Sequence, residues 1–222
     1  ALNRAVFLDR KVDAGTLLQA LRTNFSGHEP LRRYLASIPK FGAGDTAADA
    51  MTDRVLRSFA AHLGLHRNQF GGRVVPAILG FVWVVNFGAE TGATPDGRQA
   101  GEPLAHGLSP QTGAAIKGLT AALSSGTRLS LKLCAGGGAQ MWDLDPAWAT
   151  PALVKPLLQT FIQQGGHIFQ GNVISPEQLR RAQTNPEAHR DLIVRVGGYS
   201  AHFTSLSPAT QEEIITRHHY TP

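Results

Sequence analysis

R-V-G-G-Y-S-A, at residues 195–201, is the segment around which the rest of this 222-residue sequence can be interpreted. Two adjacent glycines, Gly197 and Gly198, follow a short apolar run at 192–196 and precede Tyr199. Pairs of glycine commonly mark turns, so the segment predicts a turn after a short strand. Because glycine lacks Cβ, its Cα can also become planar without a side chain striking the flanking peptide groups. Taken alone, the segment fits either a structural turn or chemistry that needs such a planar Cα.

A second segment, 92–110, favours the chemical interpretation. It reads G-A-T-P-D-G-R-Q-A-G-E-P-L-A-H-G-L-S-P. The residues of a type I turn are present at 94–97, with proline second and glycine fourth, but a turn does not explain the remaining run. The two segments together resemble the glycyl radical enzyme family, also called the pyruvate formate-lyase-like superfamily. The family pattern T-P-D-G-R-x-A-G-E-P-L-x-x-G-x-S-P is close to this segment, and the form found here is more similar to the dehydratase-like branch.

Further similarities to the family extend over nearly the whole chain. They lie at 16–21, 38–42, 71–73, 117–120, 165–173 and 211–217. The resemblance implies an α/β fold in which two antiparallel half-barrels are surrounded by helices, and of which this chain is the C-terminal, incomplete part. We expect residues 1–96 to form the C-terminal end of the barrel domain and residues 97–222 to form the glycine radical domain.

The resemblance also implies where the chemistry occurs. In this family the glycine just before the aromatic residue stores an unpaired electron on its Cα, and that position is Gly198 here. The electron is shared between the amide nitrogen and the carbonyl, which requires the planar Cα that only glycine tolerates. Arg195 and Tyr199 match flanking positions that support the radical loop. We expect no bound cofactor and no metal, and the substrate-binding residues are not identified. The radical would be installed by a separate S-adenosylmethionine and iron–sulfur activating enzyme.

The catalytic cysteine of the family is missing from its usual context. It lies upstream of the glycine in a Gly-Cys-hydrophobic-Glu motif, which this sequence lacks. Cys134, the single cysteine, has a different context and position, and we expect it to pack in the interior. We therefore expect a partner: a cysteine-bearing large subunit or a missing N-terminal portion, without which the chain would be inactive as an enzyme.

The expected function is that of a radical-bearing component of an anaerobic lyase or dehydratase-type enzyme acting on a small molecule. An alternative is a spare-part module that replaces the radical domain of a full-length enzyme after oxygen has cut it at the radical glycine. A third possibility is an inert homologue or a plain binding domain. These differ in whether a radical forms and in which polypeptide accompanies the chain.

Composition supports a folded cytoplasmic protein without nucleic-acid or membrane partners. The net charge is +5, but lysine and arginine are scattered rather than clustered, which favours a solvated surface. The sequence lacks a signal-peptide pattern, and the longest apolar run, 74–87, is too short to span a bilayer. One cysteine fits a reducing compartment. His62 and His66 have zinc-pair spacing, but the expected glutamate is absent.

Hydrophobic periodicity and capping residues predict most of the secondary structure. We expect helices around Leu17–Phe25, from Pro30 to Ser37, after Asp45, after Thr150, after Ser175 and after Ser207. The helix after Asp45 should bury Met51, Val55, Leu56, Phe59 and Leu63. We expect strands at 74–87, at 128–134 and at 192–196, and a long ordered loop through the 92–110 segment.

Overall fold

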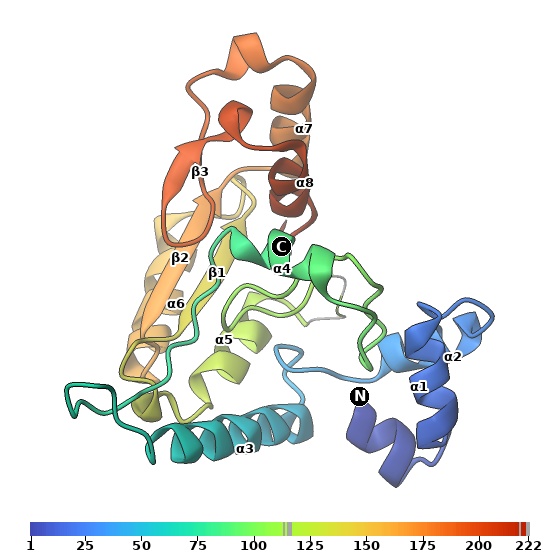
Figure 1. The fold of residues 1–222 in the computed structure, drawn as a ribbon. Coiled ribbons are helices and arrows are strands. Elements are labelled where there is room, and N and C mark those ends of the chain that lie inside the picture. The colour runs from blue at the N-terminus through green and yellow to red at the C-terminus, as the bar shows by residue number, and fades with distance from the viewer. Residues whose placement is uncertain (113, 115–116, 218, 221–222) are drawn as a thin grey trace.

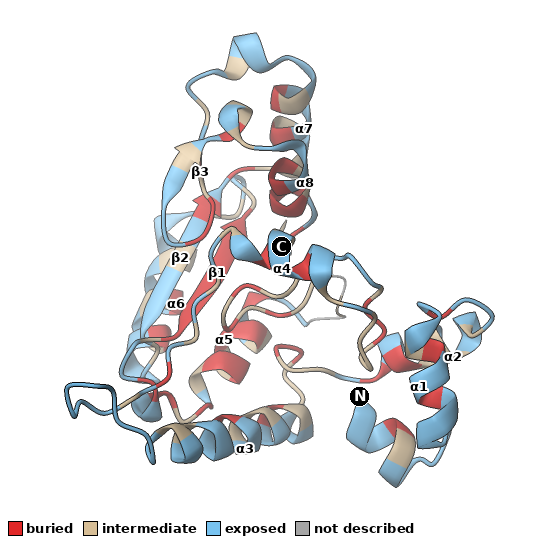
Figure 2. Ribbon diagram, in the orientation of Figure 1, coloured by how far each residue is buried: buried red, intermediate tan, exposed pale blue. Residues whose placement is uncertain are grey.

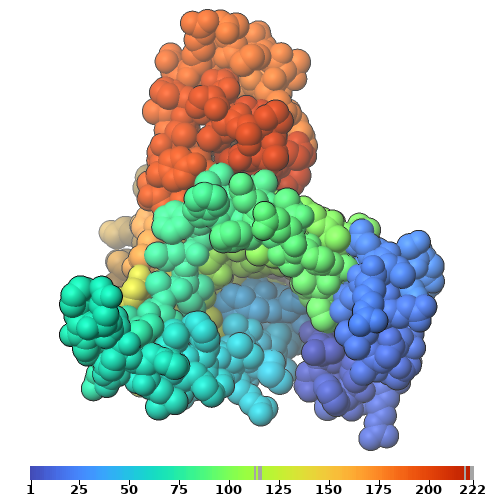
Figure 3. Space-filling model, viewed as in Figure 1, coloured from blue at the N-terminus to red at the C-terminus, as the bar shows by residue number. Residues whose placement is uncertain are grey.

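The computed structural model describes residues 1–112, 114, 117–217 and 219–220, and it shows an α/β chain in three parts (Figure 1). In Figure 1 and Figure 3 the N-terminal helices lie at the lower right, the parallel sheet with its helices lies at the centre and left, and the hairpin with its two helices forms the top. The expected α/β class is confirmed. None of the helices in the described residues is long and apolar enough to cross a membrane.

The N-terminal part packs around its own apolar cluster. Phe25 and Leu35 are its fully buried large side chains. Asp13 begins the second helix by accepting a hydrogen bond from the Thr16 backbone N–H at 2.9 Å. The helices predicted near Leu17 and after Pro30 are therefore present. The elements of this part are a π-helical turn (Asn3–Leu8), α1 (Ala14–Arg22) and α2 (Glu29–Ser37).

Helix α3 (Thr46–Leu63) begins as predicted, because the Asp45 carboxylate caps the Ala48 backbone N–H at 2.8 Å. Its predicted buried face is wrong in part. Leu56 is buried and Leu63 half-buried, whereas Met51, Val55 and Phe59 are exposed in this chain. Figure 2 shows α3 coloured mainly as exposed. The helix turns Leu56 toward the body of the chain and leaves an apolar stripe without a partner among the described residues.

Two predicted strands are not formed. The run 74–87 contains a single parallel bridge between Ile78 and Gly138, and it then becomes helix α4 (Trp83–Glu90). Pro76 has no N–H to donate to a ladder, which limits pairing there. The run 128–134 forms a short 3-10 turn (Leu131–Leu133), because its N–H groups bond to carbonyls three residues back rather than to a neighbouring strand.

A three-stranded parallel sheet forms the centre of the chain, with strand order β2-β1-β5. Strand β1 is buried along its whole length, whereas β2 is largely exposed. Helices α5 and α6 pack on the sheet around Trp142 and Phe161, whose rings meet edge to face at 5.4 Å. The elements are α5 (Leu119–Thr127), β1 (Ala139–Leu144), α6 (Pro151–Gln163), β2 (Ile168–Val173) and β5 (His219–Tyr220).

The C-terminal part is a hairpin covered by two helices around the buried Phe203. Ser175 and Ser207 cap the two helices, as predicted. The strand expected at 192–196 is present as the first strand of the hairpin. The elements are α7 (Pro176–Thr184), two 3-10 turns (Pro186–His189 and Phe203–Ser205), β3 (Ile193–Arg195), β4 (Ser200–His202) and α8 (Pro208–Thr216).

The predicted long loop is held in shape by one arginine, Arg98, which is buried. Its guanidinium donates to loop carbonyls that come before and after it in the sequence, and to a carbonyl at the C-terminal end of α4. A guanidinium fits this task, because it presents five N–H donors in a fixed plane and because a cation is stabilised at a helix C-terminus. The acceptors are the carbonyls of Gly88, Thr91, Gly92 and Glu102, at 2.6–3.3 Å.

We predict that Arg98→Lys lowers the free energy of unfolding by about 2–4 kcal/mol. A lysine keeps the charge but cannot reach all the acceptors, and each buried carbonyl left unpaired costs about 1–3 kcal/mol. Urea unfolding of the purified protein measures the change. The matched control is Arg54→Lys on the exposed face of α3, for which we expect a change within about 0.5 kcal/mol. Equal stability of the two variants would contradict the role assigned to Arg98.

Candidate functional site

The two glycines of the 195–201 segment form the turn between β3 and β4. The strands pair antiparallel, and the Val196 backbone N–H donates to the Tyr199 carbonyl at 2.9 Å. Gly198 has a φ of +82°, in the left-handed region that residues with a side chain rarely adopt. The turn itself thus explains a glycine at this position.

The turn packs against the segment that leads into α4. Figure 1 shows the tip of the hairpin next to this segment. A Cβ added at Gly198 would overlap the ring of Phe81, with Cδ1 2.7 Å away, and a Cβ at Gly197 would lie 2.8 Å from the Gly80 carbonyl oxygen. Close packing against the backbone therefore requires glycine at 197, and a side chain at 198 would have to displace the Phe81 ring. Gly198 is nevertheless exposed, and so are Phe81 and Tyr199.

Strand β2 supplies two side chains that hold the first arm of the hairpin. The Gln170 Oε1 accepts hydrogen bonds from the Gly198 backbone N–H at 2.6 Å and from Arg195 Nε at 2.8 Å. The Asn172 Oδ1 accepts from the Arg195 backbone N–H at 2.6 Å, and its amide donates to Asp143 at 2.6 Å. Residues two apart in a strand share a face, so β2 presents both amides to the hairpin.

Arg217, at the end of α8, holds the same arm from the other side. Its guanidinium donates to the carbonyl oxygens of Arg195 at 3.1 Å and Val196 at 2.5 Å. Glu213 balances its charge, accepting from Nη2 at 2.7 Å. His106 of the long loop completes the group, with Nε2 2.9 Å from a Glu213 oxygen and 3.0 Å from Arg217 Nη2. That nitrogen can donate to the carboxylate or accept from the guanidinium, but not both.

The ionisation of this group follows from its burial. Glu213 and Arg217 are 3% and 5% exposed. Burial acts to raise the pKa of Glu213, but the hydrogen bond from His106 and the charge of Arg217 outweigh it and lower that pKa. Burial raises the pKa of the neighbouring Asp143, against the opposing effects of Arg217 and Asn172. The network therefore keeps a buried ion pair directly beneath the hairpin.

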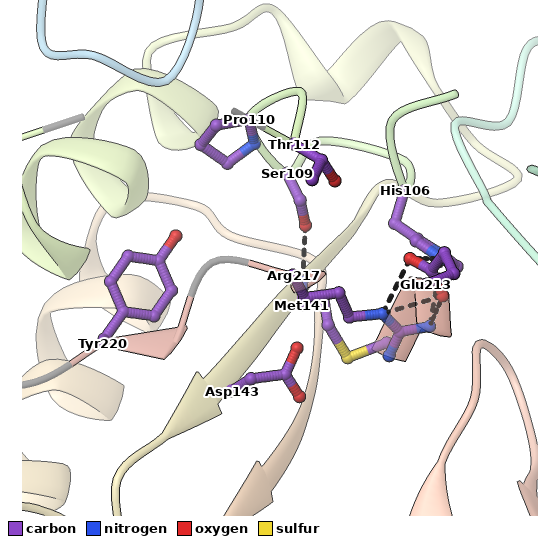
Figure 4. Close-up of a pocket in the computed structure, with 9 residues that line it drawn as sticks. All are labelled: His106, Ser109, Pro110, Thr112, Met141, Asp143, Glu213, Arg217 and Tyr220. Atoms are coloured by element: carbon purple, nitrogen blue, oxygen red, sulfur yellow. Dashed lines mark hydrogen bonds and ion pairs between the residues drawn. The ribbon is translucent and has the colours of Figure 1, made fainter. Parts of the chain in front are cut away.

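Figure 4 shows the cavity that these residues line, together with Ser109 and Tyr220. Its volume is about 20 Å³, which is room for one water molecule. Such a space is far too small for an organic substrate. Two of its lining residues, Arg217 and Glu213, belong to the group that holds the hairpin.

The structure places all three residues that the sequence predicts to carry or support the radical in one hairpin. Gly198 and Arg195 share the contact with Gln170, and Tyr199 follows in the same turn. Cys134 lies in a different cluster, fully buried among Leu56 and other leucines, and burial raises the pKa of its thiol. Within the described residues, no group of three or more histidine, cysteine, aspartate or glutamate side chains could hold a metal ion.

Sequence reasoning missed the supporting side chains Gln170, Asn172, Glu213 and Arg217. All four lie within the 165–173 and 211–217 stretches that resemble the family, so a signal was present. It did not reveal their role, because the hairpin and His106, which these side chains contact, lie in other segments of the sequence. His106, which stands where the family often has an acidic residue, is part of the ion-pair group.

We predict that Glu213→Gln lowers the free energy of unfolding by about 3–5 kcal/mol, because it leaves the Arg217 charge buried without a counter-charge. The adjacent Glu212→Gln is the control. Its pair with Arg180 is nearly half exposed, and exposed pairs contribute at most about 1 kcal/mol. Urea unfolding measures both variants.

The same pair gives a pH dependence with a definite sign. Folding lowers the pKa of the Glu213 carboxyl below its ordinary value of 4.5. The ionised carboxylate therefore stabilises the fold above pH 4.5, and this contribution is lost as the pH falls from 4.5 through the lowered pKa. Wild-type stability should therefore decline more steeply below pH 4.5 than that of Glu213→Gln. Parallel acid limbs would contradict the assignment.

Comparisons with known proteins match this geometry to one family. The model for the glycine radical matches residues 104–204, and the model for pyruvate formate lyase-like proteins matches residues 1–88. The chain is 37% identical to a probable dehydratase, YbiW, of Escherichia coli over 98% of the chain and 28% of that protein. It is 35% identical to the isethionate sulfite-lyase of Nitratidesulfovibrio vulgaris over 98% of the chain and 27% of that protein.

Solved structures give the same answer. The chain superposes on the glycerol-bound, B12-independent glycerol dehydratase of Clostridium butyricum with a TM-score of 0.93 and 34% identity, covering 98% of the chain and 28% of that protein. For the hydroxyproline dehydratase of Clostridioides difficile the TM-score is 0.90 with 32% identity, covering 97% of the chain and 28% of that protein. The predicted fold, a part of a glycyl radical enzyme barrel, is thereby confirmed. The chain belongs to the glycyl radical enzyme family, in the part of these proteins that holds the glycine radical domain.

Proposed function

We propose that this chain stores an unpaired electron on the Cα of Gly198 as the radical-bearing part of a lyase or dehydratase-type enzyme. The observation that carries the proposal is the hairpin turn. Its glycine has a left-handed φ, its N–H is fixed by Gln170, and the carbonyls just before it are fixed by Arg217. The Val196 N–H also donates to the Tyr199 carbonyl, so the backbone is held before and after Gly198 and its Cα can flatten with its neighbours in place.

The chemistry is a transfer of single hydrogen atoms. An S-adenosylmethionine and iron–sulfur activating enzyme removes one hydrogen atom from the Cα of Gly198. The glycyl radical then takes the hydrogen atom of a cysteine S–H, which restores the Cα–H bond and leaves a thiyl radical. The thiyl takes a hydrogen atom from the substrate. Arg195 and Tyr199 support the loop and do not exchange hydrogen.

The thiol must come from another polypeptide segment. Cys134 is fully buried in a leucine cluster separate from the one that contains the hairpin strand β3. The chain spans about 28% of the length of YbiW, so a cysteine-bearing subunit or a further part of the same polypeptide has room to exist. Among the described strands, β2 pairs with β1 alone and keeps an open edge, a feature that favours pairing with another chain.

Exposed aromatic side chains near the turn also favour such a covering segment. Trp83 and Phe87 stack on each other on α4 with ring centroids 6.0 Å apart, and both are more than half exposed. Exclusion of water and oxygen is what a radical reaction requires, and covering this face would provide it. We place the enzyme in an anaerobic cytoplasm, with a small polar molecule as its substrate.

Replacement of an oxygen-cut radical domain in a full-length enzyme is the alternative function. The match of residues 1–88 to the pyruvate formate lyase-like model argues against it, because a spare part needs the radical loop but not this segment. Mixing the chain with an oxygen-cleaved full-length relative distinguishes the two. Restored activity would support the repair role and contradict the role of the chain as part of an enzyme of its own.

We predict that anaerobic activation, in the presence of the cysteine-bearing portion, produces an electron paramagnetic resonance doublet that Gly198→Ala abolishes. Alanine places a methyl group where the radical requires a planar Cα. The matched control is Gly165→Ala, because Gly165 has the same φ of +82° with open space around it. The control should keep the doublet. A doublet in Gly198→Ala would contradict the proposal.

A further inference from the structure

We infer that Gln170 is a positioning residue for the radical centre, acting through its hydrogen bond to the Gly198 N–H. The inference rests on the proposed function and deepens it. It assigns a role to a side chain on β2, a strand separated from the radical loop by α7 and the segment after it. The N–H···Oε1 distance between donor and acceptor atoms is 2.6 Å, short for an amide donor.

The orientation of the Gln170 amide is fixed by a second donor. Arg195 Nε donates to the same Oε1 at 2.8 Å. A rotation of the amide by half a turn would point its NH₂ group at two N–H donors, which removes both hydrogen bonds. Arg195 therefore ensures that an oxygen, not a nitrogen, faces Gly198. The positive charge of Arg195 strengthens its own hydrogen bond to Gln170, and that bond fixes the amide.

The backbone of Arg195 is fixed independently of Gln170. Its N–H donates to Asn172 at 2.6 Å and its carbonyl accepts from Arg217 at 3.1 Å. The backbone of Arg195 is thus held in place, and its guanidinium extends from there to Gln170. Loss of the Gln170 amide would release the Gly198 N–H while the first arm of the hairpin stays anchored.

The hydrogen bond acts on the radical in two ways. It holds the peptide plane on the nitrogen side of Gly198, so the Cα can flatten with that plane already in place. It also increases electron density on the amide nitrogen, which is one of the two groups that share the unpaired electron. The N–H bond is not broken when the Cα hydrogen leaves, so the contact serves both the resting and the radical states.

Two substitutions separate this role from simple packing. Gln170→Leu removes the acceptor and keeps the approximate volume, and Gln170→Glu keeps an oxygen acceptor. Gln170→Asn is one methylene shorter, so it moves the acceptor oxygen away from the Gly198 N–H with little change in packing. It replaces Gln170→Leu in the test if the leucine variant does not fold. The control is Gln163→Leu at an exposed position of α6.

The first measurement is hydrogen exchange at the Gly198 amide in protein that has not been activated. We expect exchange in Gln170→Leu and Gln170→Asn to be about two- to tenfold faster than in wild type, the range for one hydrogen bond. Gln170→Glu and Gln163→Leu should stay close to wild type. Unchanged exchange in both acceptor-free variants would overturn the inference.

The second measurement is the electron paramagnetic resonance spectrum of the activated protein with the cysteine-bearing portion. The acceptor-free variants should give a smaller radical yield and a changed coupling to the exchangeable amide proton, detected by comparing H₂O with D₂O. A doublet identical to that of wild type in these variants would overturn the inference alone. Absence of any doublet in wild type would instead overturn the proposed function on which the inference rests.

Discussion

The contact between Arg217 and the two carbonyls before the glycine turn is the interaction on which the rest of the site depends. A buried guanidinium is tolerated because Glu213 and the carbonyls of Arg195 and Val196 surround it. The same contact links α8 to the hairpin, and His106 links both to the long loop. Helix α8 and the long loop, which lie far apart in the sequence, therefore fix one turn together.

The long loop plays a structural part in this arrangement. Arg98 ties Gly92 and Glu102 of this loop to the C-terminal end of α4. Helix α4 follows Phe81, whose ring lies against Gly198. The two sequence segments that most resemble the family are thus neighbours in the fold, 195–201 at the turn and 92–110 in its support. Their joint presence in the sequence has a physical reason, because His106 of the second segment contacts Arg217, which holds the first segment.

The sequence predicted those features that depend on local chemistry. The caps at Asp45, Ser175 and Ser207 and the glycine turn follow from side chains that bond to nearby backbone. Strand β1 was missed because it buries Gln140 and Asp143, whose partners lie on α5 and β2. The face of α3 was predicted to be buried, but its partner is not among the described residues. The boundary at residue 96 stays a prediction.

The central claim, that Gly198 holds the unpaired electron, has a direct chemical test. Dioxygen adds to a carbon radical and breaks the backbone at that residue, so the cut marks the site. Mass spectrometry of anaerobically activated protein after exposure to air should show a C-terminal fragment that begins at Tyr199, and protein that was never activated should stay whole. An intact chain after activation and air, or a cut at any other residue, would contradict the account.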